Sequence, residues 1–496
     1  MKTPLTSIEE VLKEVHTQRP NADEQLIRNA YEFAKKAHEG QKRASGEDYI
    51  FHSLETARQL AYWGMDIETI SAGLLHDVPE DTQTSLSDIQ KNFGVGIAKL
   101  VEGITKLGAL KYRGRGEQNK YVENLRKMFL AMAEDIRVII IKFADRVHNL
   151  QTLQALPEKK QYRIALESME IFAPIANRLG MWDVKGQIED LAFQYVLPEE
   201  YQWITRKIAR PLETKKIYLE KIQKKLETIF KEKNIKYRVI HGRTKGLFRT
   251  YKKALRKNRD ITKIYDLVAL RIVVEEVAQC YSILGVIHEY WKPLKGRIKD
   301  YIAQPKPNLY QSLHTTVFCD LGEIVEFQIR TKKMHDEAEF GIAAHWRYSE
   351  HEKVSPRWIK KQLSWMDELV KLQKEIQSDE SFLESVKTNI FKDHIFVFTP
   401  MGDVIDLPEG ATPIDFAYQI HTDVGDKCCG VKINDKIESL KTRLKSGDVV
   451  EIFTDKNRKL PSPDWLNFVI TNSARNHIKS ALKKGERQKV RTPISV

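Results

Sequence analysis

The alternation of hydrophobic and polar positions divides the chain into stretches with different periods. From about residue 22 to 233, apolar residues recur at spacings of three and four, as in EQLIRNAYEFAKKAH at 24–38, and this period predicts helices with one buried face. The pattern then changes to strands that alternate with helices. β-Branched runs at 266–274 and 323–331 predict strands, and the apolar segment QCYSILGVIHEYW between them predicts a helix. An α/β domain is therefore expected after an all-α domain.

A third pattern begins near residue 390. Four short strand-like runs, HIFVFTP, GDVIDLP, GVKINDKIESL and GDVVEIFT, surround one helical run, TPIDFAYQIH. This order predicts a small mixed β-grasp-like module. The segment WLNFVITNSARNHIKSALKKGERQKV that follows is predicted to be a helix ending in a basic run.

The chain is thus predicted to be multidomain, since 496 residues are too many for one hydrophobic core. The predicted boundaries are 1–195 for the all-α domain, 196–233 for a helical linker, 234–350 for the α/β domain, 351–389 for a helical connector, 390–455 for the β-grasp-like module and 456–496 for the helical tail.

Composition narrows the class of protein. Apolar content of 42% with 30% charged residues is ordinary for a globular protein. There is no run of 18 or more apolar residues, and the start MKTPLTSIEEVLKEVH has no signal-peptide core. We therefore expect a cytoplasmic protein without a membrane span. The four cysteines form no CxxC pair, which fits a reducing compartment. A net charge of +13 favours polyanionic partners such as nucleotides or RNA, and it is equally consistent with a role in solubility alone.

The stretch LLHDVPEDT, residues 74–82, places ionisable side chains within an apolar helical pattern. The segment FADRVHNL likewise places an acid, Asp145, within an apolar helical pattern. An isolated carboxylate on a buried face is costly unless it is paired or bound to a metal. Imidazoles combined with carboxylates suit Mn²⁺, Fe²⁺ or Zn²⁺. An HD dipeptide alone is more often a solvated helix end, but the further acids and the upstream histidine favour a metal site. The predicted ligands are His52, His76, Asp77 and Asp145.

Two more acids lie close to these ligands in the sequence. Glu80 follows His76 by four residues, and Asp81 follows Asp77 by four. On a continuous helix they would overhang the metal, where they could orient water or shuttle a proton. Pro79 predicts a kink or a restart of the helix at this point.

Two basic runs mark a second candidate site in the α/β domain. HGRTKGLFRTYKKALRK would place Arg249, Lys253 and Arg256 on one helical face, and KPLKGRIKDYIAQPKPNLYQSLHTT mixes cations with Tyr310 and His314. Basic loops alone are equally consistent with solvated surface. The aromatic rings shift that balance, because a nucleotide base stacks on them. The basic and polar candidates are Arg243, Lys245, Lys253, Arg256, Arg297, Lys299, Lys306, Asn308, Tyr310 and His314.

Acidic residues complete this second site. Strand alternation in EIVEFQIR puts Glu326 and Gln328 on one face, opposite the apolar residues, and Asp266 opens a neighbouring strand. Two isolated carboxylates among cations suit Mg²⁺ on a triphosphate, with one of them free to accept a hydroxyl proton. The sequence has no Walker A loop, which excludes a P-loop enzyme.

The first group of motifs resembles a known hydrolase. HDxxEDT, RxSGExYxxH (43–52) and KFADRVHNLQTL are similar to the HD hydrolase domain of the Rel/SpoT alarmone enzymes, which removes pyrophosphate from the 3′ position of (p)ppGpp using manganese. The resemblance implies that the four predicted ligands bind Mn²⁺ and that Glu80 and Asp81 are catalytic. It also implies that Arg43 packs on guanine, with Ser45, Asn149 and Thr152 holding the nucleotide. Pro79 and Ala44 depart from the usual family pattern.

The second group resembles the synthetase domain of the same family, a nucleotidyltransferase-like fold that moves the β,γ-diphosphate of ATP to the 3′-OH of GDP or GTP. By this resemblance Arg243 and Arg271 sandwich adenine, and Asp266 binds Mg²⁺. Glu326 would ligate Mg²⁺ or activate the 3′-OH. RIKD at 297–300 matches the basic motif that accompanies bifunctional members. The remaining implied roles are ATP phosphate binding by Lys245, Lys253 and Arg256, and guanine stacking by Tyr310 near Lys306, Asn308 and His314.

The third module resembles a TGS domain through TPIDFAYQIHTDVGDKCCGVKIN. The resemblance implies contact with the ribosome and with the acceptor end of uncharged tRNA near His421, and it implies neither a DNA nor a membrane partner. A satisfied core or surface role for His421 is equally consistent with the sequence. The likeness extends from about residue 22 to 480, and the family's C-terminal half, including an ACT domain, is not part of this sequence.

Two other functions stay open at this point. An HD-containing RNA 3′-end nucleotidyltransferase would also join these fold types, but it needs a closely spaced carboxylate pair, whereas YDLVALRIVV offers Asp266 alone. A non-catalytic factor that binds the ribosome or tRNA would not need two sets of catalytic residues.

Overall fold

A computed structural model describes residues 6–108, 118–264, 267–305, 310–344, 346, 366, 394–455, 457–458 and 460–490. Three predicted site residues, Asp266, Lys306 and Asn308, lie outside these ranges, as does most of the predicted connector. The chain divides into two compact units, residues 1–375 and 376–496. Within the described residues, no helix is both long enough and apolar enough to cross a membrane.

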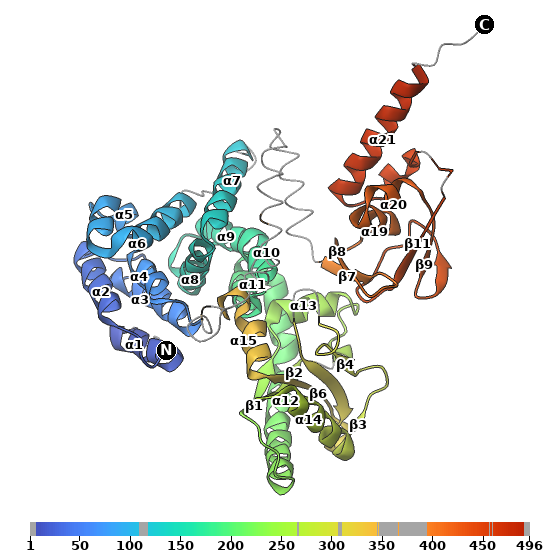
Figure 1. Cartoon of the computed structure of the whole chain (residues 1–496). Coiled ribbons are helices and arrows are strands. Elements are labelled where there is room, and N and C mark those ends of the chain that lie inside the picture. Colours follow the sequence, from blue (N-terminus) through green and yellow to red (C-terminus); the bar gives the residue numbers. More distant parts are fainter. Residues whose placement is uncertain are drawn as a thin grey trace. The chain divides into compact units, whose positions relative to one another are not determined.

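The N-terminal part of the first unit is helical, as the sequence predicts (Figure 1). The helices α3, α4 and α8 pack against one another at its centre. α8 buries a nearly continuous apolar run, from Val138 to Phe143 with Lys142 less buried, and then carries Asp145 at 3% exposure. The helices are α1 (Ile8–Gln18), α2 (Gln25–Ala37), α3 (Ile50–Tyr62), α4 (Ile67–Leu75), α5 (Val78–Asp81), α6 (Leu86–Gly108), α7 (Gln118–Glu134), α8 (Arg137–Gln151), α9 (Glu158–Glu167), α10 (Ala173–Arg178) and α11 (Trp182–Val196).

The helix restart predicted at Pro79 is confirmed. α4 ends at Leu75, and α5 begins at Val78 with the proline in its first turn, where a missing N–H is tolerated. His76 and Asp77 therefore lie between two helices rather than inside one. This break directs both side chains toward α3 and α8, as the distances given below show.

The next helix, α12 (Pro198–Glu232), is one continuous element of 35 residues with Pro211 inside it. Its C-terminal half buries residues spaced by three and four, among them Leu219, Ile222 and Leu226, in the core of the following sheet. The segment predicted as a linker thus supplies one face of the α/β domain.

The α/β domain contains a mixed sheet in the order β1-β2-β6-β5-β3, with β4 paired to β5. Only β2 and β6 are parallel in this sheet. The strands predicted at 266–274 and 323–331 are confirmed over Val268–Val274 and Ile324–Thr331, and so is the helix between them. The strands are β1 (Val239–Thr244), β2 (Val268–Val274), β3 (Lys292–Pro293), β4 (Lys299–Asp300), β5 (Leu313–Phe318) and β6 (Ile324–Thr331), and the helices are α13 (Leu247–Leu255), α14 (Val277–Tyr290) and α15 (Lys332–Phe340).

The two faces of this sheet have different roles. α12 and α14 pack against one face, where Val325, Phe327 and Ile329 of β6 are buried. The alternating residues Glu326 and Gln328 point to the other face, as predicted from the period of two. The register aligns Thr316 with Glu326, and His314 with Gln328, across β5 and β6. The polar side chains of neighbouring strands therefore meet on one surface.

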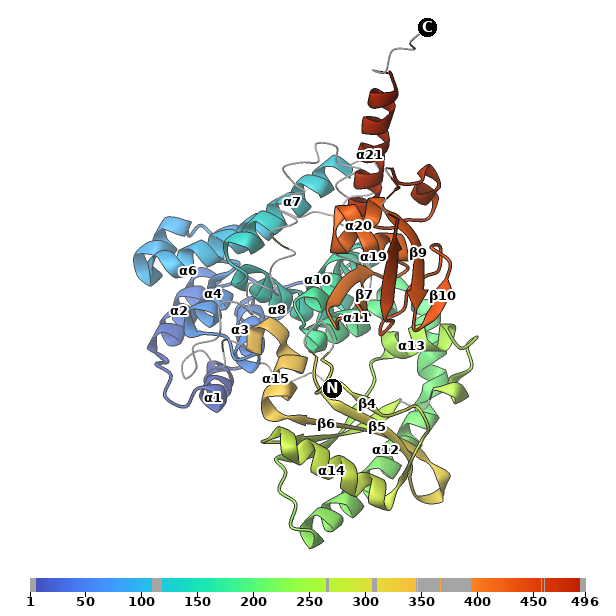
Figure 2. The same cartoon turned by 45° about the vertical axis from the view of Figure 1, so that its right-hand side comes forward.

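Among the described residues of the second unit are two small sheets and three α-helices (Figure 2). α19 packs against β8, β9 and β11, in agreement with a compact β-grasp-like module. Its strands are β7 (His394–Phe398), β8 (Val404–Pro408), β9 (Cys428–Ile433), β10 (Lys436–Glu438) and β11 (Val450–Thr454), and its helices are α19 (Pro413–Ile420), α20 (Thr422–Asp426) and α21 (Asn472–Val490).

The prediction of one helix from residue 465 onward is wrong at its start. Pro463–Asn467 form a short 3₁₀ turn, and α21 begins only at Asn472. The buried carboxylate of Asp415 accepts hydrogen bonds from the backbone N–H groups of Ile470 and Thr471 at 3.0 and 2.7 Å. These bonds hold the chain in a turn before the helix.

Candidate active sites

The four predicted metal ligands converge from α3, α8 and the break after α4. Ligand atoms of His52, His76 and Asp77 all lie within 4.8 Å of one another. His52 Nε2 is 3.4 Å from Asp77 Oδ2 and 3.2 Å from Asp145 Oδ1. His76 Nε2 is 3.2 Å from Asp77 Oδ2 and 3.9 Å from Asp145 Oδ1. The two imidazoles and the Asp77 carboxylate thus form one close group, and Asp145 lies beside both imidazoles.

The donor atoms fit a divalent cation. His76 Nδ1 donates to the carbonyl oxygen of Gly73 at 2.8 Å, because a carbonyl can only accept. Its Nε2 is buried and makes no hydrogen bond. A buried polar atom without a hydrogen bond is costly, and binding a metal would satisfy it. Nitrogen and oxygen donors without thiolates suit Mn²⁺ among other ions.

The charged groups of this cluster shift one another's pKa values. Burial alone would raise the pKa of Asp77, but the charge of His76 and the neighbouring imidazole of His52 hold it well below its usual range. Burial likewise opposes ionisation of Asp145, yet Lys142, with its Nζ 2.6 Å from Asp145 Oδ2, keeps that pKa low. Burial would lower the pKa of His76, and the two carboxylates raise it to about 9. The carboxylates are therefore ready to bind a cation.

Glu80 and Asp81 lie beside the cluster on α5. Tyr49, which lay within a recognised motif but received no role there, bridges the two sets: its hydroxyl is 2.8 Å from Asp77 Oδ2 and 2.6 Å from Asp81 Oδ2. Desolvation raises the pKa of Glu80, with Lys142 opposing and Asp77 adding to the rise. Asp81 is thus fixed by a hydrogen bond from Tyr49. Glu80 holds its proton more tightly than a free glutamate.

The predicted nucleotide-binding residues of this site belong to one network. Arg43 donates to Asn149 Oδ1 at 2.5 Å and contacts His148 Nδ1 at 3.2 Å. Asn149 also donates to Asp145, and Thr152 Oγ1 donates to the carbonyl oxygen of His148 at 3.1 Å. Ser45 is exposed in the turn after Arg43. His148 lay inside a motif used for the prediction but received no role there.

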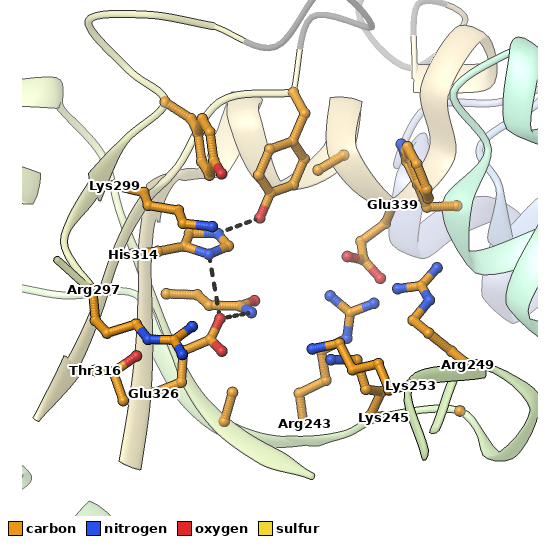
Figure 3. A pocket seen from close by; sticks show the side chains of 17 residues that line it. Arg243, Lys245, Arg249, Lys253, Arg297, Lys299, His314, Thr316, Glu326 and Glu339 are labelled. Atoms are coloured by element: carbon orange, nitrogen blue, oxygen red, sulfur yellow. Dashed lines mark hydrogen bonds and ion pairs between the residues drawn. The ribbon is translucent and has the colours of Figure 1, made fainter. Parts of the chain in front are cut away.

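The second site is a cavity of about 400 Å³ on the polar face of the mixed sheet (Figure 3). Figure 3 shows Glu326, His314 and Arg297 on one side and Arg243, Lys245 and Lys253 on the other. The predicted residues that line it are Arg243, Lys245, Lys253, Arg297, Lys299, Tyr310, His314, Glu326 and Gln328. Arg256 is exposed at the end of α13, outside this cavity.

A chain of hydrogen bonds and one ion pair ends on Glu326. The Tyr310 hydroxyl is 2.7 Å from His314 Nε2, and His314 Nδ1 is 3.2 Å from Glu326 Oε1. Gln328 Nε2 donates to the same Glu326 oxygen at 3.0 Å. Gln328 and His314 thus fix the orientation of the Glu326 carboxylate in a cavity lined by lysine and arginine side chains.

Arg271 lines a neighbouring cavity of about 680 Å³, which shares Trp182, Arg243, Arg249 and Glu339 with the first. Glu339 Oε1 on α15 lies 3.0 Å from Arg271 Nη2 and 2.9 Å from Arg330 Nη2. Burial would raise the pKa of Glu339, but the arginines lower it to about 2. Sequence reasoning missed Glu339, and it missed Trp182, which comes from the N-terminal helical part.

Comparison with known proteins finds three family domains along the chain. The chain matches the HD domain over residues 30–182, the region found in RelA and SpoT proteins over residues 242–353, and the TGS domain over residues 395–454. The small alarmone synthetase 1 from Bacillus subtilis, solved with its product pppGpp, is 24% identical over 36% of this chain and 98% of its own, with a TM-score of 0.25.

Several curated relatives match nearly the whole chain. The guanosine-3′,5′-bis(diphosphate) 3′-pyrophosphohydrolase of Aquifex aeolicus is 47% identical over 97% of this chain and 68% of its own length. The GTP pyrophosphokinase of Myxococcus xanthus is 44% identical over 95% of this chain and 62% of its own. The bifunctional (p)ppGpp synthase/hydrolase SpoT of Escherichia coli is 43% identical over 95% of this chain and 67% of its own. This chain spans roughly two thirds of the length of these relatives, and it belongs to the Rel/SpoT family of (p)ppGpp synthetases and hydrolases.

Proposed function

We propose that this chain carries both activities of its family. It transfers diphosphate from ATP to the 3′-OH of GDP or GTP, and it hydrolyses the product (p)ppGpp to GDP or GTP and pyrophosphate. The observation that supports this most directly is the presence of two separate polar sites. One is the ligand cluster around His52, His76 and Asp77, and the other is the cation-lined cavity that holds Glu326.

In the hydrolase site, His52, His76, Asp77 and Asp145 would hold Mn²⁺. Such an ion, when bound, polarises a phosphate oxygen and lowers the pKa of a bound water. Asp81, fixed by Tyr49, orients the attacking water, and Glu80 donates a proton to the departing 3′ oxygen. The water oxygen bonds to the phosphorus attached to the 3′ oxygen and gives its proton to Asp81, while the bond between that phosphorus and the 3′ oxygen breaks, so that GDP or GTP and pyrophosphate are released. Arg43 and Asn149 position the guanosine end of the substrate.

In the synthetase site, the basic side chains bind the phosphates and Glu326 acts as the general base. Lys245 and Lys253 neutralise the phosphates of ATP from one side of the cavity. Glu326 accepts the proton of the 3′-OH as its oxygen attacks the β-phosphorus, and AMP leaves. Asp266 and Glu326 are the proposed ligands for Mg²⁺, which supplies charge neutralisation of the triphosphate when bound.

The remaining predicted residues bind the two nucleotides of this reaction. Arg243 and Arg271 hold adenine, since both line the second cavity. Tyr310 stacks on guanine, with Lys306, Asn308 and His314 beside it. Arg256 is proposed to reach the ATP phosphates from the end of α13.

The TGS domain is the proposed contact with uncharged tRNA on the ribosome. His421 follows α19, is exposed, and its Nδ1 accepts a hydrogen bond from the Asp423 backbone N–H at 3.2 Å. The opposite edge of the imidazole is thus available to an RNA end. Loss of tRNA binding in His421→Asn, whose side-chain oxygen can still accept the Asp423 N–H, with an unchanged melting temperature, is the expected result.

Product analysis tests the two catalytic activities together. The protein is incubated with ATP and GDP in Mg²⁺, and separately with ppGpp in Mn²⁺, and nucleotides are separated by ion-exchange chromatography. We expect AMP and ppGpp in the first reaction, and GDP and pyrophosphate in the second. An RNA 3′-end nucleotidyltransferase would instead release pyrophosphate from ATP only when RNA is added, and a non-catalytic factor would yield neither set of products.

A further inference from the structure

His148 lies between Arg43 and the metal ligand His52. Its Nδ1 is 2.7 Å from His52 Nδ1 and 3.2 Å from Arg43 Nη1. The two imidazole rings are within 20° of parallel, with centroids 5.0 Å apart. His148 is 9% exposed on α8, and Asp145 on the same helix is one turn earlier. A single nitrogen of His148 thus faces two neighbours at once.

The chemistry of these neighbours places the protons. A guanidinium can only donate, so His148 Nδ1 accepts from Arg43 and carries no proton. The contact between the two Nδ1 atoms then needs a proton from the other ring, so His52 is protonated at Nδ1. A neutral imidazole has one N–H, which leaves the lone pair of His52 at Nε2. That Nε2 is the atom nearest Asp77 and Asp145.

The second histidine of the cluster is held in the same way by a different group. His76 donates from Nδ1 to the carbonyl oxygen of Gly73 at 2.8 Å, and its Nε2 faces the carboxylates. Both imidazoles therefore present Nε2 to the same point. For His76 the partner is backbone, whereas for His52 it is a side chain that substitution can remove.

We propose that His148 is a positioning residue that holds His52 in the tautomer whose Nε2 binds the metal. The proposal rests on the proposed Mn²⁺ site and adds a residue to it. Groups that hydrogen-bond the far nitrogen of a ligating histidine fix its ring and tautomer, and their loss commonly weakens metal binding by about 10- to 100-fold.

Substitutions of His148 can distinguish its role as a hydrogen-bond acceptor from its role in filling space. In His148→Asn the side-chain oxygen falls near the place of Nδ1 and can accept from both neighbours. In His148→Gln the amide falls near the place of Nε2, and His148→Leu keeps volume without an acceptor. A matched control is His288→Leu in the α/β domain, which removes the 2.8 Å hydrogen bond between His288 Nε2 and Thr315 Oγ1 far from the metal ligands in the sequence.

The measurement is calorimetric titration of the metal-free chain with MnCl₂, alongside its melting temperature without metal. We expect wild type, His148→Asn and His288→Leu to agree within about 3-fold, and His148→Gln and His148→Leu to bind about 10- to 100-fold more weakly. Synthesis of ppGpp from ATP and GDP should be unchanged in all the His148 variants, because their synthetase site is intact.

Three results would overturn the proposal. Equal Mn²⁺ affinity in wild type and His148→Leu would show that His52 needs no partner, while leaving the proposed hydrolase intact. Equal loss in His148→Asn and His148→Leu would show that only the imidazole's packing matters. Absence of Mn²⁺ binding in wild type would remove the metal site itself. If His148→Leu does not fold, the Asn and Gln variants decide between these results.

Discussion

The hydroxyl of Tyr49 lies 2.6 Å from Oδ2 of Asp81. The same hydroxyl is 2.8 Å from Oδ2 of Asp77 and has one proton to donate. Burial, together with the charge of Asp77, raises the pKa of Tyr49, so the phenol stays protonated near neutral pH. One tyrosine therefore joins a proposed metal ligand to a proposed catalytic acid.

Tyr49→Phe should slow ppGpp hydrolysis because Asp81 loses the bond that orients it. We expect kcat to fall by about 10- to 100-fold, as for other groups that orient a metal site, with synthesis unchanged. Steady-state kinetics with ppGpp and Mn²⁺ measure the effect. Tyr162→Phe, at a half-exposed tyrosine of the same domain, is the matched control. Hydrolysis at the wild-type rate in Tyr49→Phe would mean that Asp81 needs no such bond.

Asp77→Ala should abolish 3′-pyrophosphate hydrolysis and leave synthesis. Asp77 Oδ2 lies within 3.4 Å of both histidine ligands, so its removal takes one donor from the cluster. The loss should exceed the roughly 10²–10⁴-fold assigned to a general acid or base. Paired assays of hydrolysis and synthesis on one preparation check it. Retained Mn²⁺-dependent hydrolysis would contradict the ligand assignment.

Glu326→Gln should have the opposite pattern, with hydrolysis kept and diphosphate transfer lost. The amide has the size of the carboxylate but cannot accept the 3′-OH proton, and we expect a fall in kcat of at least about 10²-fold. AMP release from ATP and GDP measures the reaction. Near wild-type ppGpp formation in this variant would show that another group accepts the proton.

Local patterns in the sequence predicted most of what positions these residues. Alternation in β6 correctly separated Glu326 and Gln328 from the buried apolar side chains. The proline in the fourth position after Leu75 correctly marked the break that leaves His76 between helices. Such features depend on neighbours in the chain, and the period of each element displays them directly.

Long-range contacts were not visible in the same way. Trp182 belongs to α11 yet lines the synthetase cavity, more than 100 residues before Glu326 in the chain. In the sequence, Glu339 is one of several acids on an amphipathic helix. Its ion pairs with Arg271 and Arg330 depend on how the helix packs against the sheet. Tyr49 lay within a recognised motif, but its hydroxyl meets Asp81 across two separate helices. The hydrophobic period of a single element does not predict contacts between residues that are distant in the sequence.

The pairing of Glu339 predicts a dependence of stability on pH. Its pKa is lowered to about 2 in the folded protein, against 4.5 for a free glutamate. A carboxylate with a depressed pKa stabilises the fold above its unfolded pKa, and this contribution is lost as pH falls through the folded value. Glu339→Gln should therefore destabilise the first unit by roughly 3 kcal/mol at neutral pH, because two buried arginines lose their charge partner.

The difference between wild type and Glu339→Gln should be constant from pH 7 to about 5 and should shrink between about pH 4.5 and 2. Melting temperatures across this range measure it. Glu337→Gln, on the same helix, serves as a control for loss of a carboxylate without these arginine contacts. A difference that stays constant below pH 4 would show that the arginines do not lower the pKa of Glu339.

α15 also connects the two catalytic domains. Phe340, next to Glu339, meets the ring of Tyr62 edge-on with centroids 5.5 Å apart. The backbone N–H of Ile342 donates to the carbonyl oxygen of Leu179 at 3.0 Å. A Cβ added to Gly341, whose φ is +54°, would lie 2.4 Å from backbone atoms at Gly180 and Leu179. The residues after Glu339 are thus packed directly on the helical domain.

These contacts lead us to expect antagonism between the two sites, because one makes what the other destroys. An occupied synthetase site should favour a hydrolase-off arrangement, and binding linkage makes the effect reciprocal. Coupling of about 1–3 kcal/mol would change affinity by roughly 5- to 150-fold. Titration of a non-hydrolysable ATP analogue calorimetrically, with and without ppGpp held in an Asp81→Asn hydrolase site, measures it. Gly341→Ala should reduce the ratio of the two affinities toward 1, since an added methyl group would collide with the backbone at Gly180 and separate α15 from the helical domain. Equal affinities in the Asp81→Asn background alone would show that the two domains bind their nucleotides independently.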